Sequence, residues 1–388
     1  MGRLTGLVLW LCMMASPAAA QRVAGRVMLP DSVSPASRVL VEAAVGGRVA
    51  ARGLTDAAGA FSLAVPADSA VEIRALRPGM QPVRTGPFRL APGETRTVRV
   101  VLEDTPVRLQ AAAVRSERVC GPSENADAWT AWEQARVVLA TTLLNEQDPA
   151  LRLRTVEYEG WTTPASAVIV RDSSIREVPV EPPPSAALHD SLFERGFVWP
   201  ARDGTRYFMP DATLLTDHRF AERYCLRLAD PTTVPEGFLG LEFEPQRRIR
   251  GTTTGVAGTM LLDARGLLLR QIDFTYTDAP RGHDVEGAGG YLIFTQLDSG
   301  HWILNEWMLR MPSLVVRAGA MQRFRRDDGS YFMARNGVIP LEGYPVVGSN
   351  ELWARARIVF EAELGGRRLL HDAQGEALAD RALPRPRP

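Results

Sequence analysis

The spacing of His283 and Glu286 comes nearest to a catalytic metal motif in this chain. The pair fits H-x-x-E, and His301 or His371 could supply a third ligand. Catalytic zinc needs three protein ligands around one point. The pair lies, however, in a glycine-rich stretch, Arg281 to Gly290, between two segments that alternate as strands do, and the sequence has no H-E-x-x-H motif. We interpret the stretch as a solvated hairpin loop and expect neither a metal nor another cofactor.

Hydrolase chemistry has as little support. The chain has five histidines, but no G-x-S-x-G elbow accompanies them, and nothing in the sequence positions a serine and an acid around one of them. Glu242 and Glu244 share a strand face, as the two carboxylates of a glycosidase can, yet a solvent-facing row explains them equally well. Phosphate-binding loops and dinucleotide fingerprints are also absent from the sequence. We therefore expect no catalytic residues.

Aromatic residues are a better indication of binding. Trp302 and Trp307 belong to one predicted strand, and Tyr276, Tyr291 and Phe294 belong to its expected neighbours. Residues an odd number of positions apart point to opposite faces of a strand, so the two tryptophans point to opposite faces unless a bulge intervenes. One of them packs in the core, and the other could line a concave surface for a lipid or a sugar. Trp302, Trp307 and Tyr276 are therefore candidate ligand contacts, with ordinary sheet packing as the alternative.

The N-terminus has the features of a secretory signal peptide. Arg3 forms a short positive region, Leu4 to Met14 is an apolar run, and Pro17 to Ala20 offers the small residues of a cleavage site. The run is shorter than the roughly 20 residues of a membrane span, and Cys12 lacks the small preceding residue of a lipobox. We expect residues 1–20 to be removed. The mature chain would then have no transmembrane span and would lie in the periplasm, on the outer membrane or outside the cell.

Two cysteines follow the signal peptide, Cys120 and Cys225. Cysteines of an exported protein usually pair. Closing a loop of about 100 residues would contribute roughly 4–5 kcal/mol in the chain-entropy model. We predict a disulfide, with two separate buried thiols as the alternative.

The first part of the chain, residues 22–104, reads as a seven-stranded antiparallel β-sandwich. Short alternating segments such as Val23 to Leu29, Arg38 to Val45 and Arg48 to Leu54 are separated by turn residues at intervals of about ten residues. Gly46-Gly47 is a hairpin signal between two of them.

The motifs of this part resemble the carboxypeptidase regulatory-like domain, which has a transthyretin-like fold. The most specific piece is Thr55-Asp56-x-x-Gly59-x-Phe61-x-Leu63, followed by Pro78-Gly79 and by Leu90 to Glu94. Asp56 can form an Asx-turn, Gly59 can supply a positive φ, and Phe61 can enter the core. Met80 stands where the family often has an aromatic residue.

The resemblance covers about 80 residues and implies a fold more than an activity. Such domains accompany zinc carboxypeptidases, TonB-dependent receptors and uncharacterised envelope proteins, and they belong to a carbohydrate-binding-like fold group. Carbohydrate binding by the sandwich is therefore one alternative. The sandwich has only two aromatic residues, Phe61 and Phe88, to offer a sugar.

The second part of the chain predicts one helix and many strands. After a linker at 105–122, Trp129, Trp132, Leu139 and Leu143 follow helical spacing until Asp148-Pro149 ends the helix. Hairpins are expected at 256–276, 289–311 and 315–334, and a last long strand at 353–364. We predict that residues 123–372 form an antiparallel curled sheet or open barrel packed on the helix, before a disordered tail at 373–388. The arrangement is similar to the open barrels of periplasmic lipoprotein carriers.

Charge excludes one class of partner. The formal net charge is zero and the isoelectric point is about 7.0, whereas a nucleic-acid-binding domain carries a basic patch. We expect an exported, non-enzymatic envelope protein that binds or interacts with a lipid, a glycan or another envelope protein. The alternative is a carrier or sensor of a lipid-like ligand in the β-rich part.

Overall fold

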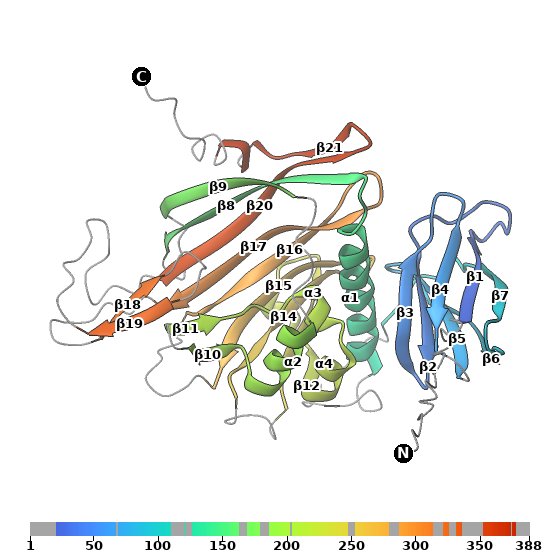
Figure 1. Cartoon of the computed structure of the whole chain (residues 1–388), viewed down its shortest axis with the longest axis horizontal. Helices are drawn as coiled ribbons and strands as arrows, with labels where there is room; N and C mark the ends of the chain where they lie inside the picture. Colours follow the sequence, from blue (N-terminus) through green and yellow to red (C-terminus); the bar gives the residue numbers. More distant parts are fainter. Residues whose placement is uncertain are drawn as a thin grey trace, which may run out of the picture. The chain divides into compact units, whose positions relative to one another are not determined.

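The computed structural model describes residues 21–66, 69–109, 120, 126–162, 169–178, 186–201, 204–246, 253–278, 287–312, 321–325, 331–335, 352–373 and 375–377. The chain forms two compact units (Figure 1). One is built from the residues up to Leu76 with Pro82–Glu103, and the other from Arg77–Gln81 with the residues from Asp104 onward. The predicted signal peptide, residues 1–20, and residues His283 and Glu286 lie outside the described residues.

The first unit is a β-sandwich of a three-stranded and a four-stranded sheet. The first sheet has the order β4 (Ala60–Val65), β1 (Gln21–Met28), β7 (Thr95–Val101), and the second has the order β3 (Arg48–Leu54), β2 (Leu40–Val45), β5 (Ala70–Leu76), β6 (Val83–Arg89). The pairing is antiparallel except between β1 and β7, which run parallel. The seven-stranded sandwich is thus confirmed, with one parallel pair inside it.

The predicted turn at Asp56 forms for the expected reasons. Oδ1 of Asp56 accepts hydrogen bonds from the backbone N–H groups of Ala58 and Ala60, both at 2.8 Å. Gly59 has φ +70°, and a Cβ there would lie 2.4 Å from the carbonyl oxygen of Val27. Only glycine fits such a position. Phe61 follows and is buried in the sandwich core.

The second unit contains one large antiparallel sheet. Its order is β12 (Tyr224–Leu228), β13 (Phe238–Pro245), β14 (Gly255–Asp263), β15 (Leu269–Thr277), β16 (Gly289–Gln296), β17 (Trp302–Pro312), β20 (Leu352–Leu364), β8 (Leu151–Thr162), β9 (Ile169–Val178), with β21 (Arg367–His371) paired to β20. Its end strands β12 and β9 do not pair with each other in the described part of the chain. The predicted mainly β fold with a large, unclosed sheet is confirmed.

Helical segments lie on one face of this sheet, which we call the inner face. The long helix α1 (Ala126–Asn145) packs there through Ala128, Trp132, Ala135 and Leu139, which share the core with the sheet. Residues 186–223, here named the cover, add α2 (Ala186–Arg195), β10 (Val198–Ala201), β11 (Gly204–Tyr207), α3 (Ala212–Leu215) and α4 (His218–Arg223) (Figure 1). The sequence predicts one helix in this part of the chain, and the cover adds three shorter ones.

Three smaller elements complete the described chain. A 3₁₀ turn, η1 (Pro231–Thr233), precedes β13, and β18 (Met321–Arg325) pairs with β19 (Tyr331–Arg335) as a separate hairpin. The predicted disulfide between Cys120 and Cys225 is present and ties the chain before α1 to the edge strand β12.

Candidate functional site

The inner face of the large sheet carries an aromatic floor. We use this name for five residues from four strands, each no more than 5% exposed: Phe243, Phe274, Tyr276, Phe294 and Trp302. Phe274 and Tyr276 meet edge to face, with ring centroids 5.9 Å apart. All five belong to one core cluster with α1 and the cover.

A β-bulge places both predicted tryptophans on this face. In the pairing of β16 with β17, Leu304 lies opposite Phe294 and Glu306 lies opposite Ile293, so Asn305 is the extra residue. One extra residue reverses the alternation of side chains. Trp302 and Trp307 therefore share the inner face, where Trp302 is buried and Trp307 packs partly buried against the same core.

The cover supplies the other side of this aromatic interior. Its β10 and β11 pair with each other and with no strand of the large sheet among the described residues. Its backbone meets the sheet at an isolated bridge between Gly196 and Thr254, where the Phe197 N–H donates to the Thr254 carbonyl at 2.8 Å. Elsewhere it buries side chains against the floor, namely Leu192, Phe193, Phe197, Trp199, Tyr207, Leu214, Leu215 and Phe220.

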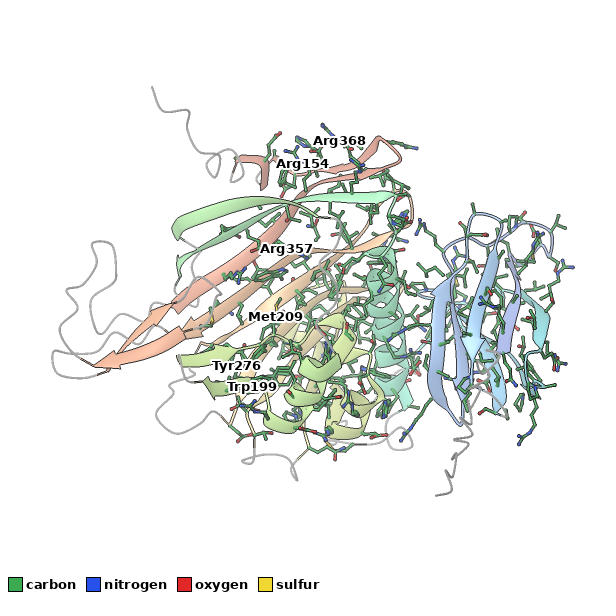
Figure 2. The ribbon with its side chains drawn as sticks, in the orientation of Figure 1. Arg154, Trp199, Met209, Tyr276, Arg357 and Arg368 are labelled. Carbon is green, nitrogen blue, oxygen red and sulfur yellow. A yellow bond between two sulfur atoms is a disulfide. The ribbon has the colours of Figure 1, made fainter. Side chains whose placement is uncertain are left out.

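Tyr276, the third predicted ligand contact, joins the floor to the cover. Its hydroxyl donates to the carbonyl of Phe208 at 2.8 Å, and its ring meets Tyr207 with centroids 5.6 Å apart. Figure 2 labels Tyr276 of the sheet and Trp199 and Met209 of the cover. Burial raises the pKa of Tyr276 well above its ordinary value, so this hydroxyl stays protonated as a hydrogen-bond donor.

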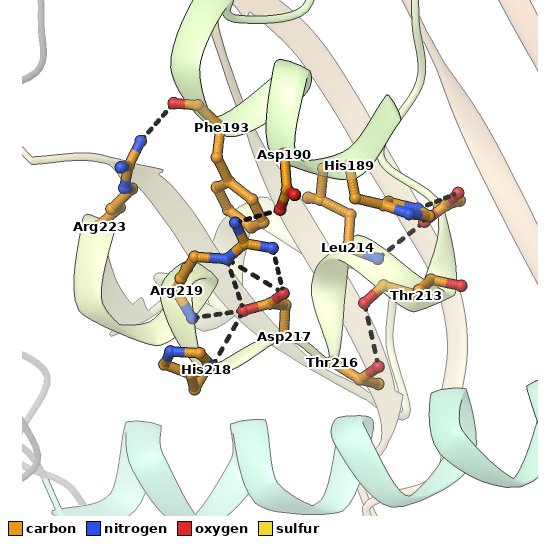
Figure 3. A network of polar contacts seen from close by, with 11 residues as sticks. His189, Asp190, Phe193, Thr213, Leu214, Thr216, Asp217, His218, Arg219 and Arg223 are labelled. Atoms are coloured by element: carbon orange, nitrogen blue, oxygen red, sulfur yellow. Dashed lines mark hydrogen bonds and ion pairs between the residues drawn. The ribbon is translucent and has the colours of Figure 1, made fainter. Parts of the chain in front are cut away.

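A polar clasp holds the three helices of the cover together (Figure 3). The Arg219 guanidinium donates to both oxygens of Asp217 and, at 2.7 Å, to Asp190 of α2, while it stacks 4.3 Å from the Phe193 ring centre. Asp217 also caps α4 by accepting from the Arg219 N–H. Hydrogen bonds and the Arg219 charge hold the pKa of Asp217 below its ordinary value despite its partial burial.

His189 makes the second link of this clasp. Its Nε2 lies 3.1 and 3.2 Å from the two carboxylate oxygens of Asp211, which caps α3 by accepting from the Leu214 N–H at 2.8 Å. The hydrogen bond that His189 donates to Asp211 raises the pKa of His189, against a smaller opposing effect of burial. The hydrogen bonds between His189 and Asp211 join α2 to α3, so we interpret this pair as structural.

The C-terminal end of α1 closes a gap in the sheet. β17 pairs with β20 only from Glu306 onward, so backbone groups of β17 before that point have no strand partner on that side. Nδ2 of Asn145 donates to the Trp302 carbonyl at 3.2 Å, and the Glu146 carboxylate accepts from the Leu304 backbone. Arg357 of β20 reaches the Leu304 carbonyl at 3.5 Å. Buried backbone groups need such partners.

Glu146 is poorly placed for a charge. It follows directly after the last residue of α1, whose dipole is negative at that end and whose last turn has no basic residue. Burial raises the pKa of Glu146, and the Asp211 carboxylate adds to the rise, whereas Arg357 and the Leu304 hydrogen bond oppose it.

One arrangement looks like a catalytic triad and is better explained as a set of side-chain contacts that stabilises the turn between β16 and β17. Ser299 Oγ lies 2.7 Å from Nδ1 of His301, and Nε2 of His301 lies 3.5 Å from Asp148. The structure thus brings together a serine, a histidine and an acid that the sequence had not positioned. In a triad the serine bonds Nε2 and the acid Nδ1, the reverse of this arrangement. His301 is also completely buried. The Gly300 N–H donates to the Leu297 carbonyl and closes the same turn.

The remaining chemical candidates are scattered. His371 pairs with Glu376 at 3.4 Å, and no group of three or more potential metal ligands occurs in the described ranges. In the sandwich, Phe61 is buried and the Phe88 ring is covered by Arg96 at 4.6 Å, so neither is a free platform for a sugar. Among the described helices, none is long and apolar enough to cross a membrane.

Comparisons with known proteins add little. No family model matches the chain, and no curated protein matches it. A 9R-lipoxygenase from Cyanothece PCC8801 is 12% identical with a TM-score of 0.19; the similarity covers 72% of this chain and 43% of the lipoxygenase. A protein of unknown function from Bacteroides fragilis is 9% identical with a TM-score of 0.16, covering 88% of this chain and 97% of that one. At such scores the backbones do not superpose, so neither similarity carries an argument.

Sequence reasoning missed the cover and its clasp. The signal for α2 was present, because Leu188, Leu192 and Phe193 have helical spacing after a proline-rich stretch. The partnership of His189 with Asp211 had no such signal, since the two residues are 22 positions apart in an irregular region.

Proposed function

We propose that this chain is an exported, non-enzymatic binding protein of the cell envelope. Its second unit would bind a hydrophobic, lipid-like ligand between the aromatic floor and the cover. The sandwich resembles carboxypeptidase regulatory-like domains, and it would be the accessory domain that accompanies the ligand-binding unit.

The observation that carries this proposal is the way the cover is attached. In the described part of the chain, backbone–backbone hydrogen bonds join the cover to the sheet region at the Gly196–Thr254 bridge and at its C-terminal end, where the Gln246 N–H donates to the Arg223 carbonyl. Most of the cover can therefore move without breaking a strand ladder. Regions that move for ligands are held by few backbone bonds. What the cover leaves behind is an apolar, aromatic face, the usual lining of a ligand site.

Unpartnered polar atoms inside this interior support the same reading. Nε1 of Trp302, Nε1 of Trp132 and Oγ1 of Thr142 are buried without a hydrogen-bond partner in the described part of the molecule. Buried polar groups normally have partners. A bound amphiphile with a polar group at the α1 side of the floor would supply them.

The first test is what the mature protein carries. Native mass spectrometry of protein purified from the periplasm is expected to show a co-purifying lipid, and the delipidated protein should bind N-phenyl-1-naphthylamine saturably. Arg219→Gln, which opens the clasp, should speed uptake of this probe, whereas Arg227→Gln on the other face of the sheet should leave it unchanged. A bare protein without saturable probe uptake in either form would refute the proposal.

The non-enzymatic part has its own test. Metal analysis and peptide hydrolysis assays of the same preparation are expected to be negative. The proposal that the chain is not an enzyme would be overturned by stoichiometric zinc together with peptide hydrolysis that a single side-chain substitution abolishes.

A further inference from the structure

The outer face of the large sheet, opposite to the aromatic floor, carries a groove of about 190 Å³. It lies across β12, β13, β14 and β15, and its polar lining is Arg227, Glu242, Glu244, Thr259 and Thr275. Cys225 and Ala257 also line it. This groove is separate from the interior in which the lipid-like ligand is proposed.

A single cross-strand row runs from this groove over five strands. Arg227 lies opposite Glu242, Glu242 opposite Thr259, Thr259 opposite Asp273, and Asp273 opposite Tyr291. Residues directly opposite one another share a face. With neighbouring strands about 4.8 Å apart, the row is roughly 19 Å long.

The side chains of the row are held in place by one another. Arg227 donates to Glu242. Nε2 of Gln271 donates to both oxygens of Asp273, at 2.8 and 3.0 Å. The Tyr291 hydroxyl donates to Glu306 at 2.5 Å. These pairs sit on strands, where side-chain positions are more precise than on loops.

Donors and acceptors alternate along the row, and this selects a class of ligand. A guanidinium, a threonine hydroxyl and a side-chain amide stand among three carboxylates, namely those of Glu242, Asp273 and Glu306. An anion would meet the carboxylates, and a cation would meet Arg227. Hydroxyl groups of a sugar both donate and accept, and the methyl groups of Thr259 and Ala257 suit its C–H faces.

The partial burial of Asp273 and Tyr291 supports a binding role for the row, because purely solvent-facing side chains would not be buried. Burial raises the pKa of Asp273, although the Gln271 hydrogen bond and the Arg310 charge oppose the rise. Burial also raises the pKa of Tyr291, and its hydrogen bond to Glu306 adds to this. A carboxyl group that is costly to ionise is better suited to neutral hydroxyls than to a cation.

We propose that this row and its groove bind a linear neutral glycan. The site differs from the carbohydrate site considered for the sandwich and does not depend on the proposed lipid-like ligand.

The test is affinity electrophoresis of the full mature chain in native gels that contain laminarin, hydroxyethyl cellulose or glucomannan. We expect retardation by at least one polymer. Glu242→Gln and Asp273→Asn should each weaken it about tenfold or more, as loss of a charged hydrogen bond does. Glu236→Gln, an exposed acid in the β12–β13 loop, is the matched control and should bind as the parent does.

Circular dichroism must show the parent spectrum in each variant, so that lost binding is not lost folding. No retardation by any polymer, or retardation that survives both substitutions, would overturn the proposal. So would a shift produced by hexalysine and by none of the glycans, because it would assign the row to a cationic polymer. Uptake of N-phenyl-1-naphthylamine should remain unchanged in both variants, which separates this proposal from the lipid proposal.

Discussion

Removal of the Cys120–Cys225 disulfide is expected to cost a substantial part of the free energy of unfolding of the second unit. The two cysteines are 105 residues apart in the sequence. In the chain-entropy model a loop of this length restricts the unfolded chain by about 4.7 kcal/mol at 25 °C. The free energy of unfolding of a native protein is only about 5–15 kcal/mol. Because unfolded-state structure and lost sulfur packing alter this figure, the expected loss is roughly 3–5 kcal/mol.

The assay is urea unfolding of the mature chain, followed by tryptophan fluorescence, with the double variant Cys120→Ala and Cys225→Ala. The urea midpoint should fall, and the slope m should rise because the unlinked chain exposes more surface. Reduced parent protein is the control and should unfold like the double variant. A loss below about 1 kcal/mol, or a reduced parent as stable as the oxidised one, would contradict the reasoning.

Three further predictions concern the cover and the sheet. Since the pKa of His189 is raised in the folded state, the stability lost in His189→Gln should be largest below about pH 6.5 and should shrink at higher pH, in thermal melts across pH; a loss that does not change with pH would contradict this. Since burial raises the pKa of Glu146, Glu146→Gln should become more stable than the parent as the pH rises above about 4.5, measured by the same melts; no such gain would contradict the inference that the Glu146 charge is unfavourable there. Gly258→Ala should cost about 1–3 kcal/mol or more in urea unfolding, because its Cβ would lie 1.9 Å from the Asp273 carbonyl oxygen; a neutral result would show that the strands can separate there.

Much of the strand content was predictable because it is locally encoded. Asp263 to Gly266 and Asp298 to Gly300 provide turn residues between alternating segments, and both hairpins form as predicted. β6 has a weaker local signal than the other strands of the sandwich, since Gly86-Pro87 interrupts its alternation. The parallel pairing of β1 with β7 joins the two ends of the sandwich sequence and has no local signal.

The candidate site residues show the limit of this reasoning. Strand periodicity predicted opposite faces for Trp302 and Trp307, and the bulge at Asn305 put them on one face. A bulge depends on the partner strand, because it is the pairing that leaves one residue over. The contact of Ser299 and Asp148 with His301 likewise required α1 to end beside the β16–β17 turn.

By itself the sequence determined the mainly β character, the helix α1 and the two cysteines available to pair, because periodicity and composition are properties of short stretches. Only the tertiary structure decided that α2–α4 cover the aromatic floor, that His189 meets Asp211, and that one polar row crosses five strands. These depend on register and on packing between distant segments. A shift of one residue in a single strand would send its side chains to the other face, so no local pattern specifies them.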